Sequence, residues 1–246
     1  DRQEILEFNW NDPDHLSSLF KKFPNQIAAV ILTPYHHPSF QRSEMPTAGF
    51  WETVSATCRK EEAFLILDDV RAGGRLHDGG SHRFFNFTPD LAVYSKGLGN
   101  GYAISACVGK AEHKLASAEV FLTGSCWNDA VAMAAAISSL KISEREGVAK
   151  QVLSKGKYFC DQLESVAKKQ NFPLLMTGPP SMPYPSVEGD FNLFKIQEFC
   201  RFCAEEGLYF HPHHNWFISN AHTFESIDHS IKKASLAIDK LSQQSN

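Results

Sequence analysis

Two stretches of the chain decide its fold: residues 63–74 read AFLILDDVRAGG, and residues 91–101 read LAVYSKGLGNG. Each stretch begins with a short, mostly apolar run and continues into a charged residue followed by glycines. Apolar runs without alternation are typical of strands buried in a parallel sheet. Asp68 and Lys96 stand where the two runs end. Because the carboxyl ends of parallel strands meet at one edge of a sheet, we expect these two side chains to share a ligand site.

The rest of the first half of the chain follows the same alternation. Short apolar runs at residues 27–32 and 104–108 predict two further strands. Apolar residues at helical spacing predict helices at residues 49–61 and 128–143, and Pro13 predicts the start of an earlier helix. Strands that alternate with helices indicate an α/β fold, with a mostly parallel sheet and helices on both faces.

The pattern changes after about residue 144. Long helical patterns at residues 146–169 and 191–206 are separated by short segments, and an amphipathic helix closes the chain. We therefore expect two domains, residues 1–144 with the sheet and residues 145–246 as a small α+β domain.

The composition excludes several classes of protein. A chain of 246 residues with 43% apolar residues can bury a sizeable core. The net charge is −4 and no run of basic residues stands out, which argues against a nucleic-acid partner. No apolar stretch approaches the ~20 residues that a membrane span needs, so we expect no membrane partner.

The six cysteines are scattered along the chain, and its first residues do not resemble a secretion signal. We therefore expect reduced thiols and a cytoplasmic location. Cys200 and Cys203 form a CxxC pair, but the pair lies inside a helical pattern and has no second pair of ligands at metal spacing. Two half-buried helix residues explain it better than zinc or redox chemistry, and we expect no metal.

The stretch at residues 65–75, together with residues 88–91 and 94–102, resembles the signature of class III pyridoxal phosphate (PLP) aminotransferases. Within that family it is most similar to the glutamate-1-semialdehyde 2,1-aminomutase-like branch. Weaker similarity continues through residues 121–125 and 211–217. The resemblance implies the PLP-dependent transferase fold of type I, PLP as cofactor, and a homodimer with the cofactor site at its interface. It also implies an enzyme that moves an amino group on a small amino- or oxo-carboxylic acid.

The resemblance implies a role for each of five residues. Lys96 matches the lysine that holds PLP as a Schiff base, and Asp68 matches the acid that faces the nitrogen of the cofactor ring. Val70 matches the apolar residue against the ring face. Ser125 matches a hydroxyl that reaches the cofactor phosphate, usually that of the neighbouring subunit, and Thr123 is a second candidate for that contact.

These residue types suit the implied chemistry. An aldehyde cofactor needs a primary amine to hold it, and lysine supplies one on a flexible stem. The same amine can afterwards move a proton to or from the substrate. An ionised carboxylate at Asp68 keeps the ring nitrogen protonated, which makes the ring an electron sink. A hydroxyl at Ser125 can donate to a phosphate oxygen.

The chain departs from the family in several places. Family members are longer, and their first part carries the phosphate-cradling loop and the aromatic residue that stacks on the ring. Nothing in this chain matches either feature, so we expect it to be the C-terminal part of a longer enzyme, with an incomplete large domain. Thr33 stands where an acid is usual, Asp69 where glutamate is commoner, and Gly74 where an aromatic residue is usual.

Two alternatives remain open: a truncated, non-catalytic remnant of such an enzyme, and a PLP racemase or lyase on the same fold. The sequence does not identify the substrate, because Arg71 and Arg75 suit either a substrate carboxylate or a surface ion pair. His211, His213 and His214 form a dense cluster with no carboxylate or thiol at metal spacing. The resemblance implies that these histidines border the substrate entrance.

Overall fold

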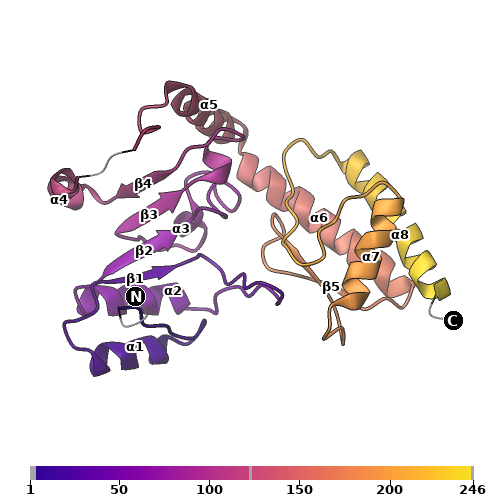
Figure 1. Cartoon of the computed structure of the whole chain (residues 1–246), viewed down its shortest axis with the longest axis horizontal. Helices are drawn as coiled ribbons and strands as arrows, with labels where there is room; N and C mark the ends of the chain where they lie inside the picture. Colours follow the sequence, from indigo (N-terminus) through magenta and orange to yellow (C-terminus); the bar gives the residue numbers. More distant parts are fainter. Residues whose placement is uncertain (1–3, 122–123, 245–246) are drawn as a thin grey trace. The chain divides into compact units, whose positions relative to one another are not determined.

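The computed structural model describes residues 4–121 and 124–244 of the chain (Figure 1). They form two compact units. The first is made of Asp1–Pro34 and Pro46–Val148, and the second of Tyr35–Met45 and Ala149–Asn246. The short segment Tyr35–Met45 therefore belongs to the unit that contains the C-terminal half of the chain, which no pattern in the sequence indicated.

The first unit is built on a four-stranded mixed sheet. Its strands, in spatial order, are β1 (Ala29–Leu32), β2 (Phe64–Asp68), β3 (Leu91–Tyr94) and β4 (Ala106–Gly109). The first three strands are parallel, and β4 runs antiparallel to β3. The prediction of a mostly parallel sheet is thus confirmed, and β4 is its antiparallel edge.

Helices α1 (Pro13–Lys22) and α2 (Phe50–Lys60) cover one face of this sheet. Pro13 occupies the first turn of α1, and the Asp12 carboxylate caps the helix by accepting from the His15 backbone N–H at 2.9 Å. Apolar side chains of both helices pack on the strands, and Trp51 stacks on Phe87 with ring centroids 4.0 Å apart. The buried members of this core are Leu16, Phe20, Val30, Phe50, Trp51, Val54, Cys58, Ala63, Leu65, Leu67, Phe87 and Ala92.

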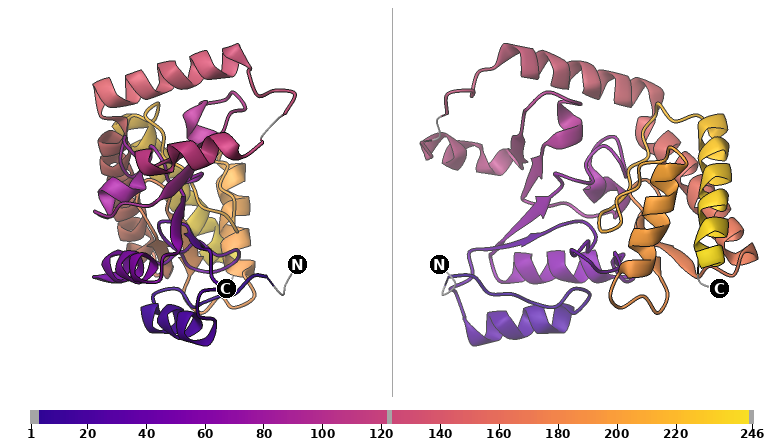
Figure 2. Two further views of the ribbon diagram at one scale, coloured as in Figure 1. Left: turned by 90° about the vertical axis from the view of Figure 1, so that its left-hand side faces the viewer. Right: turned by 45° about the vertical axis from the view of Figure 1, so that its right-hand side comes forward.

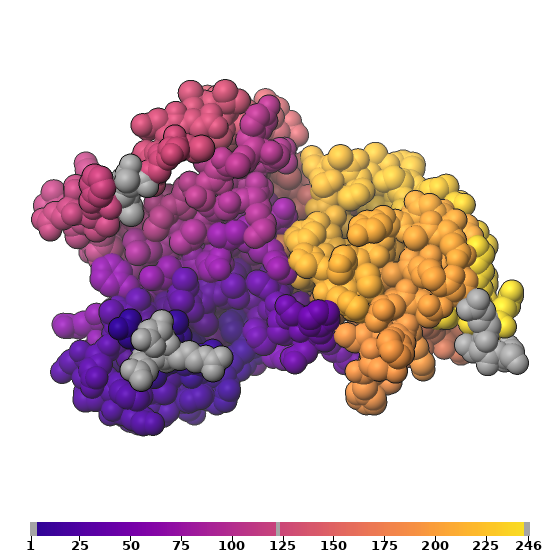
Figure 3. Space-filling view, viewed as in Figure 1, coloured from indigo at the N-terminus to yellow at the C-terminus, as the bar shows by residue number. Residues whose placement is uncertain are grey.

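The remaining helices of the first unit are short, apart from one. They are α3 (Ser81–Phe84), η1 (Lys96–Leu98), η2 (Ala111–His113), α4 (Lys114–Glu119) and α5 (Ala130–Glu146). The Asp129 side chain caps the start of α5, and Gly147, in the left-handed conformation, ends it. Helices lie on both faces of the sheet (Figure 2). Helices α4 and α5 stand out from the body of the unit, as the space-filling view shows (Figure 3).

The second unit is an α+β structure. Its elements are α6 (Val148–Lys169), β5 (Leu174–Thr177), β6 (Tyr184–Val187), α7 (Phe194–Glu205) and α8 (Phe224–Gln244). The two strands pair antiparallel, and α7 packs on α8. Phe159, Leu163, Phe199, Cys203 and Ile238 lie in its core. Among the described residues, no helix combines the length and the apolar character that crossing a bilayer would require.

Candidate functional site

Asp68 and Lys96 follow neighbouring parallel strands at the same edge of the sheet. Asp68 is the last residue of β2 and pairs in register with Val93 of β3. β3 ends at Tyr94, and Lys96 opens η1 two residues later. The strand ends expected from the sequence are therefore the ones observed. In open parallel sheets, ligands bind beyond the carboxyl ends of the strands.

The Asp68 carboxylate is oriented by its own backbone. Asp68 is half-buried, and its Oδ1 accepts a hydrogen bond from the Val70 backbone N–H at 3.1 Å. Over the described ranges, Oδ2 of Asp68 has no hydrogen-bond partner. One oxygen thus fixes the rotamer, while the second is available to a ligand that offers an N–H group.

Lys96 holds an uncommon backbone conformation. Its φ is +48°, in the left-handed region, where a side chain other than glycine costs about 1–2 kcal/mol. The side chain is exposed, and its ammonium makes no ion pair with any residue that the structure describes. The segment is held from both sides, since Ser95 Oγ donates to the Ile104 carbonyl at 2.9 Å and Ser139 Oγ donates to the Gly97 carbonyl at 3.4 Å. Residues kept in such conformations cluster at active sites.

Two glycines near these strand ends are required by close contacts. A Cβ at Gly73 would lie 2.7 Å from the Asp69 carbonyl oxygen and 2.7 Å from Cδ1 of Tyr94. A Cβ at Gly99 would collide with the Tyr102 carbonyl oxygen. Any larger residue at either position would push apart the backbone on which Asp68 and Lys96 stand.

Asp69 is the buried acid of this region. Its side chain is 1% exposed, and it accepts from the Ser81 backbone N–H at 2.8 Å and from Ser81 Oγ at 2.5 Å. Burial raises the pKa of Asp69, although the two bonds from Ser81 act in the opposite direction. Sequence reasoning treated Asp69 only as a shortened glutamate and did not find Ser81, because no local pattern links residues twelve positions apart.

The other predicted cofactor contacts lie in less enclosed places. Val70 is half-buried in the turn after Asp68. Ser125 is exposed in a turn closed by the bond from the Trp127 N–H to the Gly124 carbonyl at 3.1 Å. Thr123 lies outside the described residues. The cofactor contacts assigned to these residues stay predictions.

Arg75 connects the loop after β2 to the segment that carries Lys96. Its Nη1 donates to the Arg71 carbonyl at 2.6 Å, and it lies 3.8 Å from the position of a Cβ at Gly97. Its guanidinium therefore stands beside the residue that follows Lys96. The histidine cluster belongs to the second unit, where the His211 ring lies 6.2 Å from that of His213.

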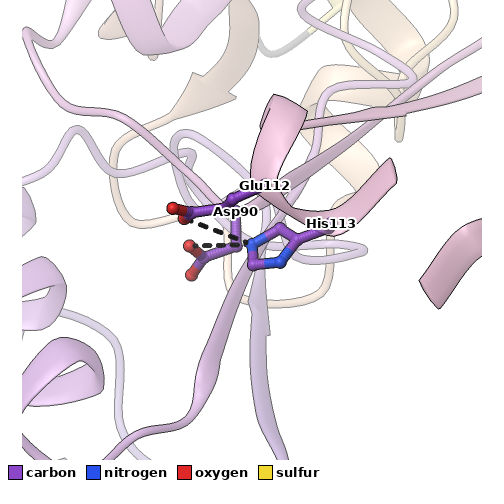
Figure 4. Close-up of side chains that lie close together, drawn as sticks. All are labelled: Asp90, Glu112 and His113. Carbon is purple, nitrogen blue, oxygen red and sulfur yellow. Dashed lines mark ion pairs between the residues drawn. The ribbon is translucent and has the colours of Figure 1, made fainter. Parts of the chain in front are cut away.

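A second charged cluster lies at the amino ends of the parallel strands, since Asp90 directly precedes β3. Figure 4 shows its Asp90, Glu112 and His113 side chains close together. Asp90, directly before β3, accepts from the Leu65 N–H at 2.8 Å and from Lys110 Nζ at 2.6 Å. Nε2 of His113 lies 3.7 Å from Asp90 and 3.6 Å from Glu112. Burial raises the pKa of Asp90, but the Leu65 and Lys110 bonds outweigh it, and the net pKa is lowered.

This Asp90 cluster has the spacing of a metal site, because one ligand atom from each of Asp90, Glu112 and His113 falls within 4.8 Å of the others. The Lys110 ammonium already neutralises the carboxylate that a cation would need. We therefore interpret Asp90 as a structural tie between β2 and the chain after β4.

Comparisons with known proteins agree on one family. The family model described as "Aminotransferase class-III" matches residues 7–241. A 3-aminobutyryl-CoA aminotransferase of Cloacimonas acidaminovorans is 32% identical over 94% of this chain and 56% of its own length. An aminopentol aminotransferase of Sphingopyxis macrogoltabida is 33% identical over 94% of this chain and 55% of its own. A glutamate-1-semialdehyde 2,1-aminomutase of Opitutus terrae is 30% identical over 97% and 59%.

A solved structure shows that the fold is shared as well. The FumI protein of Sphingopyxis sp. MTA144, determined in its PLP internal aldimine form, superimposes with a TM-score of 0.94 at 32% identity. The match covers 97% of this chain and 57% of that protein. The chain spans about half the length of the curated relatives it matches. The chain belongs to the class III aminotransferases, a family of PLP-dependent enzymes.

Proposed function

We propose that this chain is part of an enzyme that uses PLP to move an amino group on a small amino- or oxo-carboxylic acid, as an aminotransferase or aminomutase. The observation that carries the proposal is the pairing of Asp68 and Lys96 at the carboxyl ends of neighbouring parallel strands. The aminotransferases and aminomutases among its relatives support both reactions.

The residues at this edge suit PLP by their chemistry. A lysine without an ion-pair partner among the described residues supplies the amine for an aldehyde, and Asp68 offers a carboxylate oxygen for a protonated ring nitrogen. Gly73 and Gly99 allow the close backbone packing that holds these two strand ends, because a Cβ at either position would collide with neighbouring atoms of the chain. Val70 would contact the ring face, and Ser125 or Thr123 would donate to a phosphate oxygen.

PLP, when bound, supplies the electron sink that makes a substrate C–H bond acidic. Lys96 would hold the cofactor through its ε-amino group and, once released as a free amine, could accept a proton from the substrate carbon and later donate it back. Asp68 would accept a hydrogen bond from the ring nitrogen with the carboxylate oxygen that Val70 does not occupy.

We also infer the larger frame of the enzyme. Residues 1–144 would form part of the large PLP-binding domain and residues 145–246 the small domain. The family resemblance supports a homodimer with the cofactor site at the interface and Ser125 reaching across it. Scattered cysteines, with buried thiols at Cys200 and Cys203, support a cytoplasmic location.

The test is to add PLP to the purified chain, reduce it with borohydride and map the modified lysine by peptide mass spectrometry. The modification should fall on Lys96, and the visible absorbance of the bound cofactor should disappear in Lys96→Ala. The matched control is Lys157→Ala, which removes an exposed lysine paired with Asp161 in the second unit and should leave the absorbance unchanged. Absorbance that persists in Lys96→Ala would contradict the assignment.

A non-catalytic chain is the second candidate, because the match covers only 55–59% of the first relatives' lengths. PLP titration of the chain separates the two. Stoichiometric binding at Lys96, followed by amino transfer from candidate donors, supports the enzyme, whereas binding without any product supports the remnant. Racemised or decarboxylated products would instead indicate a PLP racemase or lyase on the same fold.

A further inference from the structure

The loop between β2 and α3 closes on itself. We name residues 69–81 the 69–81 loop. The chain leaves β2 at Asp69 and comes back to the same place at Ser81, where α3 begins. The two bonds from Ser81 to the Asp69 carboxylate join the ends of the loop, and both side chains are buried, at 1% and 0% exposure. Compact loops with joined ends are frequently functional.

The closed end of the loop is also bound to β3. The Asp69 backbone N–H donates to the Val93 carbonyl at 3.0 Å, and the Asp69 carbonyl accepts from the Gly73 N–H at 2.9 Å. Gly73 and Gly80 both lie against the Tyr94 side chain, so that neither position has room for a Cβ. The loop is therefore packed against the last residue of β3, two positions before Lys96.

The loop bonds to Asp68 and lies beside Gly97, the residue that follows Lys96. The Val70 N–H orients the Asp68 carboxylate from within the loop. On the other side, the Gly73 carbonyl oxygen and Arg75 Nη1 each lie 3.8 Å from the position of a Cβ at Gly97. One closed loop thus touches the chain on which each of the two candidate catalytic residues stands.

We propose that Asp69 and Ser81 are positioning residues, which fix the placement of Asp68 relative to Lys96 by holding the 69–81 loop closed. The catalytic meaning of this placement rests on the proposed function. The structural part of the proposal does not depend on it: loss of the Asp69–Ser81 hydrogen bonds should make the segment around Lys96 more mobile whether or not PLP is bound. Asp69 needs no contact with the cofactor for this role.

Asp90 provides a matched control on the same two strands. Like Asp69, it is an acid that joins neighbouring chain segments through one backbone N–H and one side-chain donor, but it does so before β3 rather than after β2. Loss of either acid should destabilise the sheet, since it leaves a backbone N–H without its hydrogen-bond partner. Only loss of the Asp69–Ser81 bonds should loosen the segment around Lys96.

The first measurement is amide hydrogen exchange of the chain without PLP. Ser81→Ala and Asp69→Asn should each raise exchange at residues 70–75 and 95–98 about tenfold, the effect expected when a buried hydrogen bond is lost. Asp90→Asn should leave exchange at residues 95–98 unchanged. Unchanged exchange there in the Ser81 variant, or an equal rise in the Asp90 variant, overturns the proposal. Ser81→Ala keeps the backbone donor and carries the test if Asp69→Asn does not fold.

The second measurement is the pH titration of the absorbance of bound PLP, with borohydride trapping at Lys96. The Ser81 and Asp69 variants should shift the midpoint and reduce trapping at Lys96, while Asp90→Asn should match the unmodified chain. If the unmodified chain does not trap PLP at Lys96, the proposed function fails, and hydrogen exchange still decides the role of the loop. Normal trapping with an unshifted midpoint in both loop variants contradicts positioning.

Discussion

Lys96 is held in a conformation that is unfavourable for lysine, and this has a measurable consequence. Its φ of +48° penalises every residue with a Cβ, whereas glycine adopts it freely. Lys96→Gly should therefore unfold with a free energy about 0.5–1 kcal/mol higher than Lys96→Ala, after allowing for the greater freedom of glycine in the unfolded chain.

Urea denaturation of the two variants checks this prediction. Both variants lack the lysine side chain beyond Cβ, so a difference between their free energies of unfolding reports mainly the backbone. The matched pair is Lys110→Gly and Lys110→Ala, at a lysine whose backbone is not among those with positive φ; there glycine should be the less stable residue. The same order of stability at both positions would contradict strain at Lys96.

The cysteines should fall into two classes of reactivity. Burial raises the pKa of Cys58 to about 11, with the charge of Asp90 adding to the effect, and burial raises those of Cys160 and Cys200 to about 12. Thiols with raised pKa values carry almost no thiolate at pH 8 and react slowly. Cys107 and Cys126 are exposed. We expect a thiol reagent at pH 8 to modify these two first, and mass mapping checks it; early modification of Cys200 would contradict the burial argument.

At the scale of elements, Asp90 makes the sheet sensitive to acid. A carboxyl whose pKa is lowered in the folded state contributes stability above its ordinary pKa of 3.8. That contribution is lost as the pH falls below this value and the carboxyl takes up a proton. Thermal unfolding between about pH 5 and about pH 2 should therefore show a steeper loss of stability in the unmodified chain than in Asp90→Asn.

The control for this prediction is Glu119→Gln, which removes an exposed acid for which no ion pair is described. Between about pH 5 and about pH 2, Glu119→Gln should lose stability with falling pH as steeply as the unmodified chain. If Asp90→Asn and the unmodified chain lose stability equally steeply, the hydrogen bonds of Asp90 with Leu65 and Lys110 do not stabilise the fold as proposed.

Local patterns predicted some elements well and others not at all. The strands ending at Asp68 and Tyr94 are continuous apolar runs, and Pro13 marks a helix start, so each is visible within a few residues. An apolar run carries no sign of direction, which is why the antiparallel β4 was not foreseen. The Asp69–Ser81 bonds depend on how a whole loop closes, and the left-handed Lys96 depends on packing around it. Neither feature has a local sequence pattern from which it could be predicted.

On the scale of the whole molecule, α5 has an apolar face without a covering among the described residues. Its Met133, Ile137 and Leu140 are 42%, 53% and 50% exposed and share one side of the helix, although Ala132 and Ala136 are buried. Contiguous exposed apolar side chains mark interaction surfaces. We expect the chain to form dimers through this face, and Ile137→Glu with Leu140→Glu to give monomers in light scattering.

The matched variant is Ser138→Glu, which adds a charge to the same helix at an exposed polar position. It should leave the mass unchanged. A dimer that survives the double substitution would assign the interface to another surface.

The membership of Tyr35–Met45 in the second unit makes residues 46–148 an insertion within it. In that unit Tyr35 is fully buried and bonds to Met182, and Ser43 bonds to Thr177 and Asn215. During synthesis on the ribosome the segment Tyr35–Met45 emerges early. All of residues 46–148 are then synthesised before residues 149–246, with which this segment packs. The second unit therefore completes its fold last, whereas the strands that carry Asp68 and Lys96 can assemble first.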